Sequence, residues 1–455
     1  MTKQHDPVDT EELAELGVLS PAASTAPIEG GIREYFHNYM LRLRGGDMGS
    51  LPAVCGLIVL VVLFSAIQDT FHTLYNFGNM LTEGAGTIFL AMGLVFVLLL
   101  GEIDLSAGTT GGVCAFVMAR LMVGFGSPWN TWPITLGAAL LTGLIIGLTI
   151  GLLVSKVRIP SFVVTLAFFL AFQGVALVIS DWHRGPIGNI IVSDKVVLDF
   201  ANGNMPLWAG WVLVAIVVAG YAWTKIAAAT ARRRAGLVGE PMSVMLLKVG
   251  ALAVVSIGLV LLLNRNRSLN KGSIFRNVNG HTVRVTPPPV EGVPWVVPVV
   301  VVLFTVLTFA LSRTRYGRHV YAVGGNEEAA RRAGIGVDRI RISVFMVCSF
   351  MAAVAGIEIA SNVASVAPNS YNGNILLLAV GAAVIGGTSL FGGKGRLLDA
   401  LIGGAVVEVI QNGMADLVSG PNGPAVQYIV TGLVLLLAAA VDALSRRRAG
   451  SSGLA

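Results

Sequence analysis

Long apolar runs separated by short polar segments fill most of this 455-residue sequence. A helix needs roughly 20 mostly apolar residues to cross the hydrocarbon core of a bilayer, so each run is a candidate span. The pattern predicts an all-α, polytopic transmembrane helix bundle with about 12 membrane-embedded segments. The predicted segments cover residues 51–68, 84–101, 105–123, 133–154, 161–180, 207–228, 244–264, 294–311, 342–361, 375–391, 397–417 and 425–444.

The ends of the chain are predicted to be tails outside a transmembrane domain of residues 47–445. Residues 1–46 begin with an acidic stretch that contains Ala and Pro and lacks the apolar core of a cleavable signal peptide. Within them, residues 32–44 carry apolar side chains at helical spacing beside arginines, which indicates either an interfacial helix or an extension of the first span. Residues 446–455 form the second tail, and the distribution of Lys and Arg places both termini in the cytoplasm.

Composition and charge agree with a membrane protein. Hydrophobic residues make up 55% of the chain and charged residues 12%, whereas a soluble domain is usually about one quarter charged. The formal net charge of +6 is explained by basic segments that stay in the cytoplasm, and no tract of basic and aromatic residues predicts a nucleic-acid partner. The segment 264–293 opposes this rule, because it is predicted to lie outside and yet carries several Lys and Arg. The three cysteines lie in apolar runs without metal spacing, so neither a cofactor nor a disulfide is predicted.

Two predicted spans run into glycine-rich polar sequence. The two interruptions are GEIDLSAGTTGG at residues 101–112 and GGTSLFGGKGR at residues 386–396, and similar tetrapeptides, LAMG at 90–93 and LAVG at 378–381, precede them. Interrupted hydrophobic segments in matching halves predict a transport path, because irregular backbone at membrane depth needs protein or water around it. The alternative is two ordinary helices joined by short loops.

Gly143, Gly147 and Gly151 repeat every four residues in the fourth predicted span. Small residues at this spacing let two helix backbones approach closely. We expect the partner helix to lie in the same subunit; a contact across a dimer is the alternative.

The polar segment 313–341 contains a short, highly charged helix according to its pattern. The residues that define it are Gly325, Asn326, Glu327, Glu328, Arg331, Arg332 and Gly334. The asparagine is a good N-cap, and the two acids lie at the positive end of the helix, four residues before the two arginines. The last glycine supplies the left-handed position that ends the helix. From composition alone, such an element is either a solvated linker or a docking element for a cytoplasmic partner.

Four strings carry a resemblance to a known family. They are GEIDLSAG at residues 101–108, VRIPSFVVTLAFFLAFQG at 157–174, YGRHVYAVGGNEEAARRAGIGVDRIRI at 316–342 and AAVIGGTSLFGGKGRLLDALIGGAVVEVIQNGM at 382–414. In content and order they resemble the ribose/xylose-type permeases of carbohydrate ABC importers. The pair of spans around 232–234, with the long insert after it, is more similar to the xylose-type branch.

The resemblance implies a multi-pass subunit of the bacterial inner (plasma) membrane that moves a xylose-like or related monosaccharide and has no ATPase of its own. Its expected partners are cytoplasmic ABC ATPase subunits, a periplasmic sugar-binding protein and a second permease copy, most simply as a homodimer. The short helix would be the coupling helix, seated in a groove of the ATPase within the cytoplasmic coupling loop 313–341. Glu102 departs from the family pattern, which more often has glycine or histidine before Ile-Asp-Leu-Ser.

Polar and aromatic residues inside spans are candidates for the substrate path, because ionisable groups there are costly to insert. The candidates are Asp104, Ser106, Phe169, Phe172, Gln173, Glu358, Glu408, Gln411 and Asn412, with Trp182 and Asp416 beside them. Carboxylates and amides can bind sugar hydroxyls, and an aromatic face can cover the sugar ring. The alternative is that these groups form contacts between helices, or, for Asp104 and Ser106, an N-cap and a first-turn acid.

Enzymatic motifs are absent from the sequence. Residues 388–395, TSLFGGKG, approach a phosphate-binding loop but lack its first glycine and its final Ser or Thr. No HExxH, GxSxG or metal-spaced histidine cluster occurs, so catalytic, cofactor-binding and metal-binding residues are not predicted. The rival functions are an ion-driven secondary sugar transporter, an ABC permease for a nucleoside or branched-chain amino acid, and a membrane-embedded enzyme.

Overall fold

The computed structural model describes a set of ranges that leaves out both ends of the chain. They are residues 50–181, 188–236, 241–268, 274–278, 281–285, 289–371, 373–417, 425–433 and 436. The predicted tails and the predicted interfacial helix therefore lie outside the described residues, as does Trp182.

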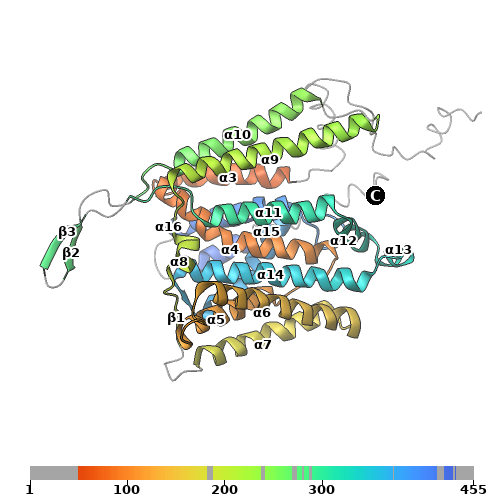
Figure 1. The fold of residues 1–455 in the computed structure, drawn as a ribbon, viewed down its shortest axis with the longest axis horizontal. Coiled ribbons are helices and arrows are strands. Elements are labelled where there is room, and N and C mark those ends of the chain that lie inside the picture. The colour runs from red at the N-terminus through yellow and green to blue at the C-terminus, as the bar shows by residue number, and fades with distance from the viewer. Residues whose placement is uncertain are drawn as a thin grey trace, which may run out of the picture. The chain divides into compact units, whose positions relative to one another are not determined.

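Helices dominate the described part of the chain, which confirms the all-α class (Figure 1). Among these residues, nine helices are long and apolar enough to cross a membrane. They are α4 (Leu74–Leu99), α5 (Ala107–Gly124), α6 (Trp132–Leu152) with its π-helical extension η1 (Leu153–Val157), α7 (Ser161–Asp181), α9 (Leu207–Arg234), α10 (Met242–Leu263), α11 (Val296–Arg313), α14 (Val337–Val363) and α16 (Leu397–Leu417). Two shorter apolar helices, α3 (Leu51–Ile67) and α15 (Gly373–Gly386), match further predicted segments.

Some predicted boundaries were wrong for local reasons. Helix α4 begins ten residues before the predicted start of its span at 84, because the Thr73 hydroxyl caps it by accepting a hydrogen bond from the Asn76 amide at 3.3 Å. Helix α15 ends at Gly386 rather than at 391, because the next residue, Gly387, has a φ of +120°. The last predicted span, 425–444, is described only in part, and residues 425–433 are helical.

The chain divides into two compact units. The larger comprises Gly49–Trp211 and Leu259–Ala440, and the described part of the smaller one is formed mainly by Val212–Gly258, which is most of α9 and α10. In the larger unit α14 is the central helix and packs against α4, α5 and α6 (Figure 1).

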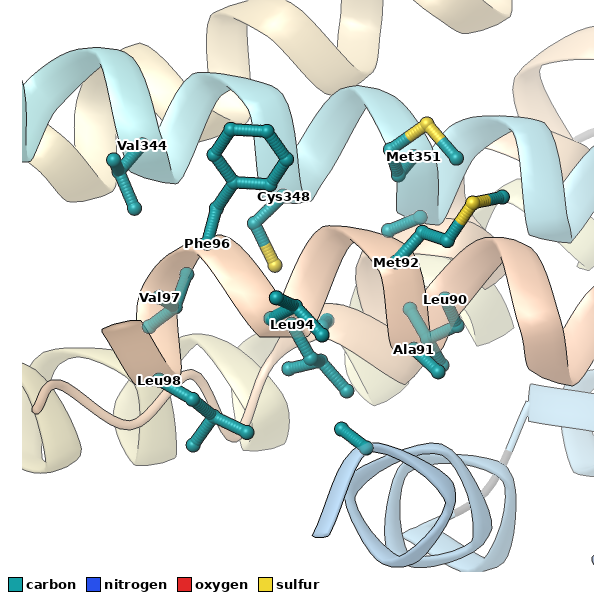
Figure 2. Close-up of a cluster of buried hydrophobic side chains, with 14 of the residues drawn as sticks. Leu90, Ala91, Met92, Leu94, Phe96, Val97, Leu98, Val344, Cys348 and Met351 are labelled. Atoms are coloured by element: carbon teal, nitrogen blue, oxygen red, sulfur yellow. The ribbon is translucent and has the colours of Figure 1, made fainter. Parts of the chain in front are cut away.

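Helices α4 and α14 share the largest apolar core of the larger unit. Figure 2 shows this contact, where Met92 and Phe96 of α4 lie beside Cys348 and Met351 of α14. All four side chains are fully buried. Lipid tails are as apolar as these side chains, so close packing rather than exclusion of water is expected to hold these helices together.

The glycine repeat of α6 faces α14 of the same chain, as predicted. A Cβ atom built on Gly147 would lie 2.6 Å from the Phe345 carbonyl oxygen, and one on Gly143 would lie 2.7 Å from the Ser349 carbonyl oxygen. Helix α5 approaches α14 in the same way, since a Cβ on Gly111 would lie 2.6 Å from the Ala352 carbonyl oxygen. The backbones of these helices therefore touch at positions where only glycine fits.

Short elements that the sequence did not predict occupy the connections. Helix α8 (Lys195–Asn202) begins at Asp194, whose carboxylate accepts hydrogen bonds from two amides, and ends against Ser361 of α14. Strand β1 (Ile190–Ile191) pairs antiparallel with β4 (Ser365–Val366), just before the 3₁₀ turn η2 (Pro368–Tyr371). Strands β2 (Ile274–Val278) and β3 (His281–Val285) form a hairpin in the segment predicted as a long outer loop.

Candidate functional site

The predicted charged helix is present as α13 (Glu327–Arg332). The Asn326 side chain caps it by accepting a hydrogen bond from the Ala329 amide at 2.9 Å. The two predicted ion pairs form, with 2.9 Å between Glu327 and Arg331 and 3.2 Å between Glu328 and Arg332. Gly334 follows with a φ of +80°, the left-handed conformation expected of it.

A second helix, α12 (Arg315–Gly325), precedes α13 and was missed by the sequence reasoning. The Thr314 hydroxyl caps it by accepting from the Gly317 amide at 3.2 Å, and Val320 and Val323 are buried on one face. The sequence signal was available, since the capping threonine stands before apolar residues at helical spacing. Gly325 is the last residue of α12, and Asn326 separates α12 from α13.

The two glycine-rich interruptions meet each other at the end of α12. The Leu99 carbonyl oxygen, at the end of α4, accepts a hydrogen bond of 2.9 Å from the Gly393 amide. A Cβ on Gly324 would overlap the same carbonyl oxygen, so α12 lies directly on this junction. The Tyr321 hydroxyl donates to the Gly395 carbonyl oxygen at 2.8 Å. Helix α12 therefore contacts the end of α4 at Leu99 and the second interruption at Gly393 and Gly395. The sequence did not indicate a role for Leu99 or Tyr321 in this junction.

Arg341, at the start of α14, joins α13 to the first interruption. Its guanidinium lies 2.8 Å from Glu327 and 2.8 Å from Glu102. Partial burial alone would raise the pKa of the Glu327 carboxyl, but the charge of Arg341 and hydrogen bonds from Arg331 and Arg341 outweigh it, so this pKa is lowered. The sequence reasoning recorded Glu102 only as a departure from the family pattern and overlooked Arg341.

Asp104 and Ser106 lie in the first interruption, and both are buried. One Asp104 oxygen accepts hydrogen bonds from the Ser106 amide at 2.9 Å and from the Ser106 hydroxyl at 2.7 Å. Helix α5 begins at Ala107 with Ser106 in the N-cap position, but that side chain makes no capping bond and Asp104 precedes the first turn. The N-cap position expected at this site is therefore occupied by Ser106, whereas the expectation of a first-turn acid was wrong, because Asp104 precedes the helix and forms an Asx turn with Ser106.

Glu358 of α14 and Glu408 of α16 face the same stretch of α4. A Cβ on Gly86 would lie 2.5 Å from a Glu358 carboxylate oxygen, and one on Gly84 would lie 2.9 Å from Glu408 Cγ. Both acids are buried, and Glu358 Oε1 has no hydrogen-bond partner among the described residues. Glycines in α4 thus make room for two carboxyl groups inside the bundle.

The remaining substrate-path candidates divide between helix packing and a cavity. Asn412 exchanges two amide hydrogen bonds with Asn76 of α4, at 2.7 and 2.9 Å, so it connects two helices. Phe172 packs against Phe168 in the core, with ring centroids 5.1 Å apart. The Phe169 ring lies 3.6 Å from a Cβ built on Gly373. Gln173 of α7 is partly buried, and the side chain of Asp416 lies outside the described residues.

Gln411 lines a cavity of about 320 Å³ between α15, α16 and the helical residues 425–433. Its lining residues are Ser370, Asn374, Ile375, Leu378, Gln411, Gln427, Tyr428 and Thr431. None of these side chains is ionisable near neutral pH, and the Asn374 amide donates to the Tyr428 hydroxyl at 2.9 Å. The cavity offers amide and hydroxyl groups to a neutral ligand; apart from Gln411, its lining was missed because it is contributed by separate segments.

Known proteins resemble the chain over most of its length. Residues 76–439 match the family model described as branched-chain amino acid transport system / permease component. The xylose transport system permease protein XylH of Escherichia coli is 31% identical over 398 residues, which are 87% of this chain and 92% of that protein. XylH of Haemophilus influenzae is 30% identical over 90% of this chain and 100% of its own length. The ribose import permease protein RbsC of Escherichia coli is 29% identical over 86% of this chain and 92% of its own length. No solved structure matches.

Proposed function

The chain belongs to the family of branched-chain amino acid transport system permease components, and from this premise we propose that it is the membrane-spanning subunit of an ATP-driven sugar importer. It is a multi-pass membrane protein, and its curated relatives named above are transport permeases. The transported solute would be a monosaccharide such as xylose. ATP hydrolysis would take place on a separate cytoplasmic subunit.

The similarity to xylose and ribose permeases over most of the chain is the observation that carries the sugar proposal. The cavity at Gln411 supports it, because sugar hydroxyls need amide and hydroxyl partners. The amide of Asn374 and the phenol ring of Tyr428 fit a polyol with an apolar ring face. A free amino acid, the solute in the family's description, carries two charges and would need ionic partners that the lining of this cavity lacks.

The exposed face of α13 supports docking of an ATPase. The side chains of Glu328 and Arg332 are 68% and 79% exposed, so they are available to a partner. Binding of a cytoplasmic ATPase there implies that this end of the bundle is the inner one, with both termini inside. A periplasmic binding protein would then dock on the opposite side, over residues 181–205 and 265–293, and a second permease copy would complete the path.

In the proposed mechanism, ATP-driven closure of the ATPase subunits displaces α13. Because α12 contacts the second glycine-rich interruption and Arg341 joins α13 to Glu102 in the first, this displacement can change the access of the path from the outer to the inner side. The direction of transport follows if the two states differ in their affinity for the sugar and for the loaded binding protein.

Vesicle transport tests the proposal. The permease is reconstituted with a xylose-importer ATPase and a xylose-binding protein from the same organism, and uptake of radiolabelled xylose is measured with ATP, without ATP and without the ATPase. We expect uptake only in the complete system with ATP, and an unchanged rate when an ionophore removes the proton gradient. Uptake without the ATPase that follows the proton gradient would instead favour an ion-driven transporter, for which the buried Glu358 and Glu408 are available.

A charge reversal tests the docking role of α13. The double substitution E328R/R332E retains an ion pair within the helix but inverts the charges that face a partner. We expect ATP hydrolysis to become independent of xylose uptake, while the amount of protein inserted in the membrane stays unchanged. The matched control is E328D/R332K, which keeps the sign of the charge at both exposed positions. Normal uptake by E328R/R332E would reject the docking role.

A further inference from the structure

A chain of charged contacts leads from α13 to the break between α4 and α5. One Glu327 oxygen accepts from Arg331 at 2.9 Å, and the other accepts from Arg341 at 2.8 Å. The Nε atom of Arg341 lies 2.8 Å from Glu102 Oε1. The side chains of Arg341 and Glu102 are only 15% and 17% exposed, so solvent and salt screen this pair less than an ordinary surface ion pair.

The segment after Glu102 is held to the rest of the bundle by hydrogen bonds. The Ile103 carbonyl oxygen accepts from the Thr165 hydroxyl of α7 at 3.3 Å, and the Ile103 amide donates to the Ser161 hydroxyl at 3.4 Å. Asp104 is fully buried and fixes Ser106 at the start of α5 through its two hydrogen bonds. Glu102 is thus followed directly by one residue bound to α7 and by Asp104, which is bound to the start of α5.

The other contacts between this junction and α12 are of a different kind. Gly324, Gly392 and Gly393 bring backbone against backbone near Leu99 and Gly101, which sets how closely the segments approach. These backbone contacts contain no charge, and the side-chain bond from the Tyr321 hydroxyl of α12 to the Gly395 carbonyl oxygen joins neutral groups. The pair between Glu102 and Arg341 is an ionic side-chain contact at the same junction, and its energy depends directly on where the start of α14 and the neighbouring α13 lie.

From these contacts we infer that Glu102 is a positioning residue. Its ion pair with Arg341 makes the conformation of residues 101–106 depend on the position of α13, and so connects docking at α13 to the start of α5. This role rests on the proposed function, because the displacement of α13 would come from an ATPase. The acid that departs from the family pattern is then part of the coupling apparatus of this chain.

The first experiment needs no partner. Hydrogen–deuterium exchange of the purified permease in lipid nanodiscs is compared for wild type, E102Q, R341Q and E102Q/R341Q. Loss of one poorly screened ion pair predicts exchange about fivefold faster in E102Q at the amides of residues 326–334 and 101–106. The double variant should exchange no faster than R341Q, because the two residues act through one contact. The control K195Q removes the exposed ion pair to Asp199 within α8 and should leave both segments unchanged.

Equal exchange in E102Q and wild type, or strictly additive effects in the double variant, would overturn the inference whether or not the protein transports sugar.

The second experiment measures xylose taken up per ATP hydrolysed in the reconstituted system. We expect E102Q to lower this ratio at least threefold with nearly normal ATP hydrolysis, and E102D to restore part of it. Failure of the wild type to take up xylose would reject the proposed function, whereas a normal ratio in E102Q beside an active wild type would reject the coupling role alone.

Discussion

The contact between α6 and α14 allows the cost of one added methyl group to be worked out. In Gly147→Ala the new Cβ would lie 2.6 Å from the Phe345 carbonyl oxygen and 2.7 Å from Met346 Cα. Ordinary van der Waals contact begins at 3.4 Å, so the two backbones must separate by 3.4 − 2.6 = 0.8 Å. The opposing atoms belong to the main chain of a buried helix and cannot move aside as a side chain would.

Overpacking of this kind costs about 1–3 kcal/mol, and replacement of glycine by alanine within a helix returns up to about 1 kcal/mol. After subtraction of the full gain in helix propensity, we therefore expect Gly147→Ala to destabilise the protein by about 0–2 kcal/mol. The matched control is Gly137→Ala in the same helix, where a Cβ meets no atom within 4 Å. That variant retains only the gain in helix propensity.

Thermal unfolding of the two variants in the same detergent, followed by intrinsic tryptophan fluorescence, gives the comparison. We expect Gly147→Ala to unfold at a lower temperature than wild type and Gly137→Ala at an equal or higher one. If Gly147→Ala were as stable as Gly137→Ala, the close approach of the two backbones would be refuted.

Three further predictions concern the other contacts. The pKa of Glu327 is lowered, so its ion pairs stabilise α13 fully above the ordinary pKa of 4.5 and are lost as the pH falls through the lowered pKa. Amide exchange at residues 326–334, corrected for intrinsic rates, should therefore accelerate only below pH 4.5. Asn412→Leu leaves Asn76 Oδ1 without its hydrogen-bond donor, while the Asn76 side-chain nitrogen keeps its bond to the Phe71 carbonyl oxygen, and should cost about 1–2 kcal/mol of thermal stability. The double variant N76L/N412L removes the unpaired oxygen and should recover part of this loss; equal stability of the single and double variants would contradict the pairing. Tyr321→Phe removes the hydroxyl bound to the Gly395 carbonyl oxygen and should cost about 1 kcal/mol of local stability, seen as faster exchange at residues 389–395 and not at the outer residues 195–202.

Much of the fold could be predicted from the sequence, because the bilayer imposes a length and a composition on each helix. The glycine repeat in α6 predicted a close helix contact and the charged string predicted α13 with its cap, since both depend on neighbours three or four residues apart. Similar local signals for α12, the capping Thr314 and buried apolar residues at helical spacing, were present but were overlooked.

The parts that could not be predicted depend on contacts between residues far apart in the chain. Arg341 is more than 200 residues from Glu102, and nothing local to either residue indicates that they pair. The same holds for Asn76 with Asn412 and for the lining of the cavity at Gln411. Buried polar residues could be identified from sequence, but whether each one binds another helix or faces a cavity depends on the tertiary structure.

The glycine contacts of α14 also restrict how the bundle can change shape. Helices whose main chains touch have no rotamers to exchange at the contact, so α5, α6 and α14 should travel as one rigid body when the transporter alternates between states. The seam between α4 and α16 is instead filled by side chains that can adopt new rotamers, because Gly84 faces the Glu408 side chain and Gly404 faces the Ile88 side chain. Sliding or hinging should therefore concentrate at this seam. Distances between spin labels placed on either side of it should change between the two states, whereas distances between labels on α5, α6 and α14 should not.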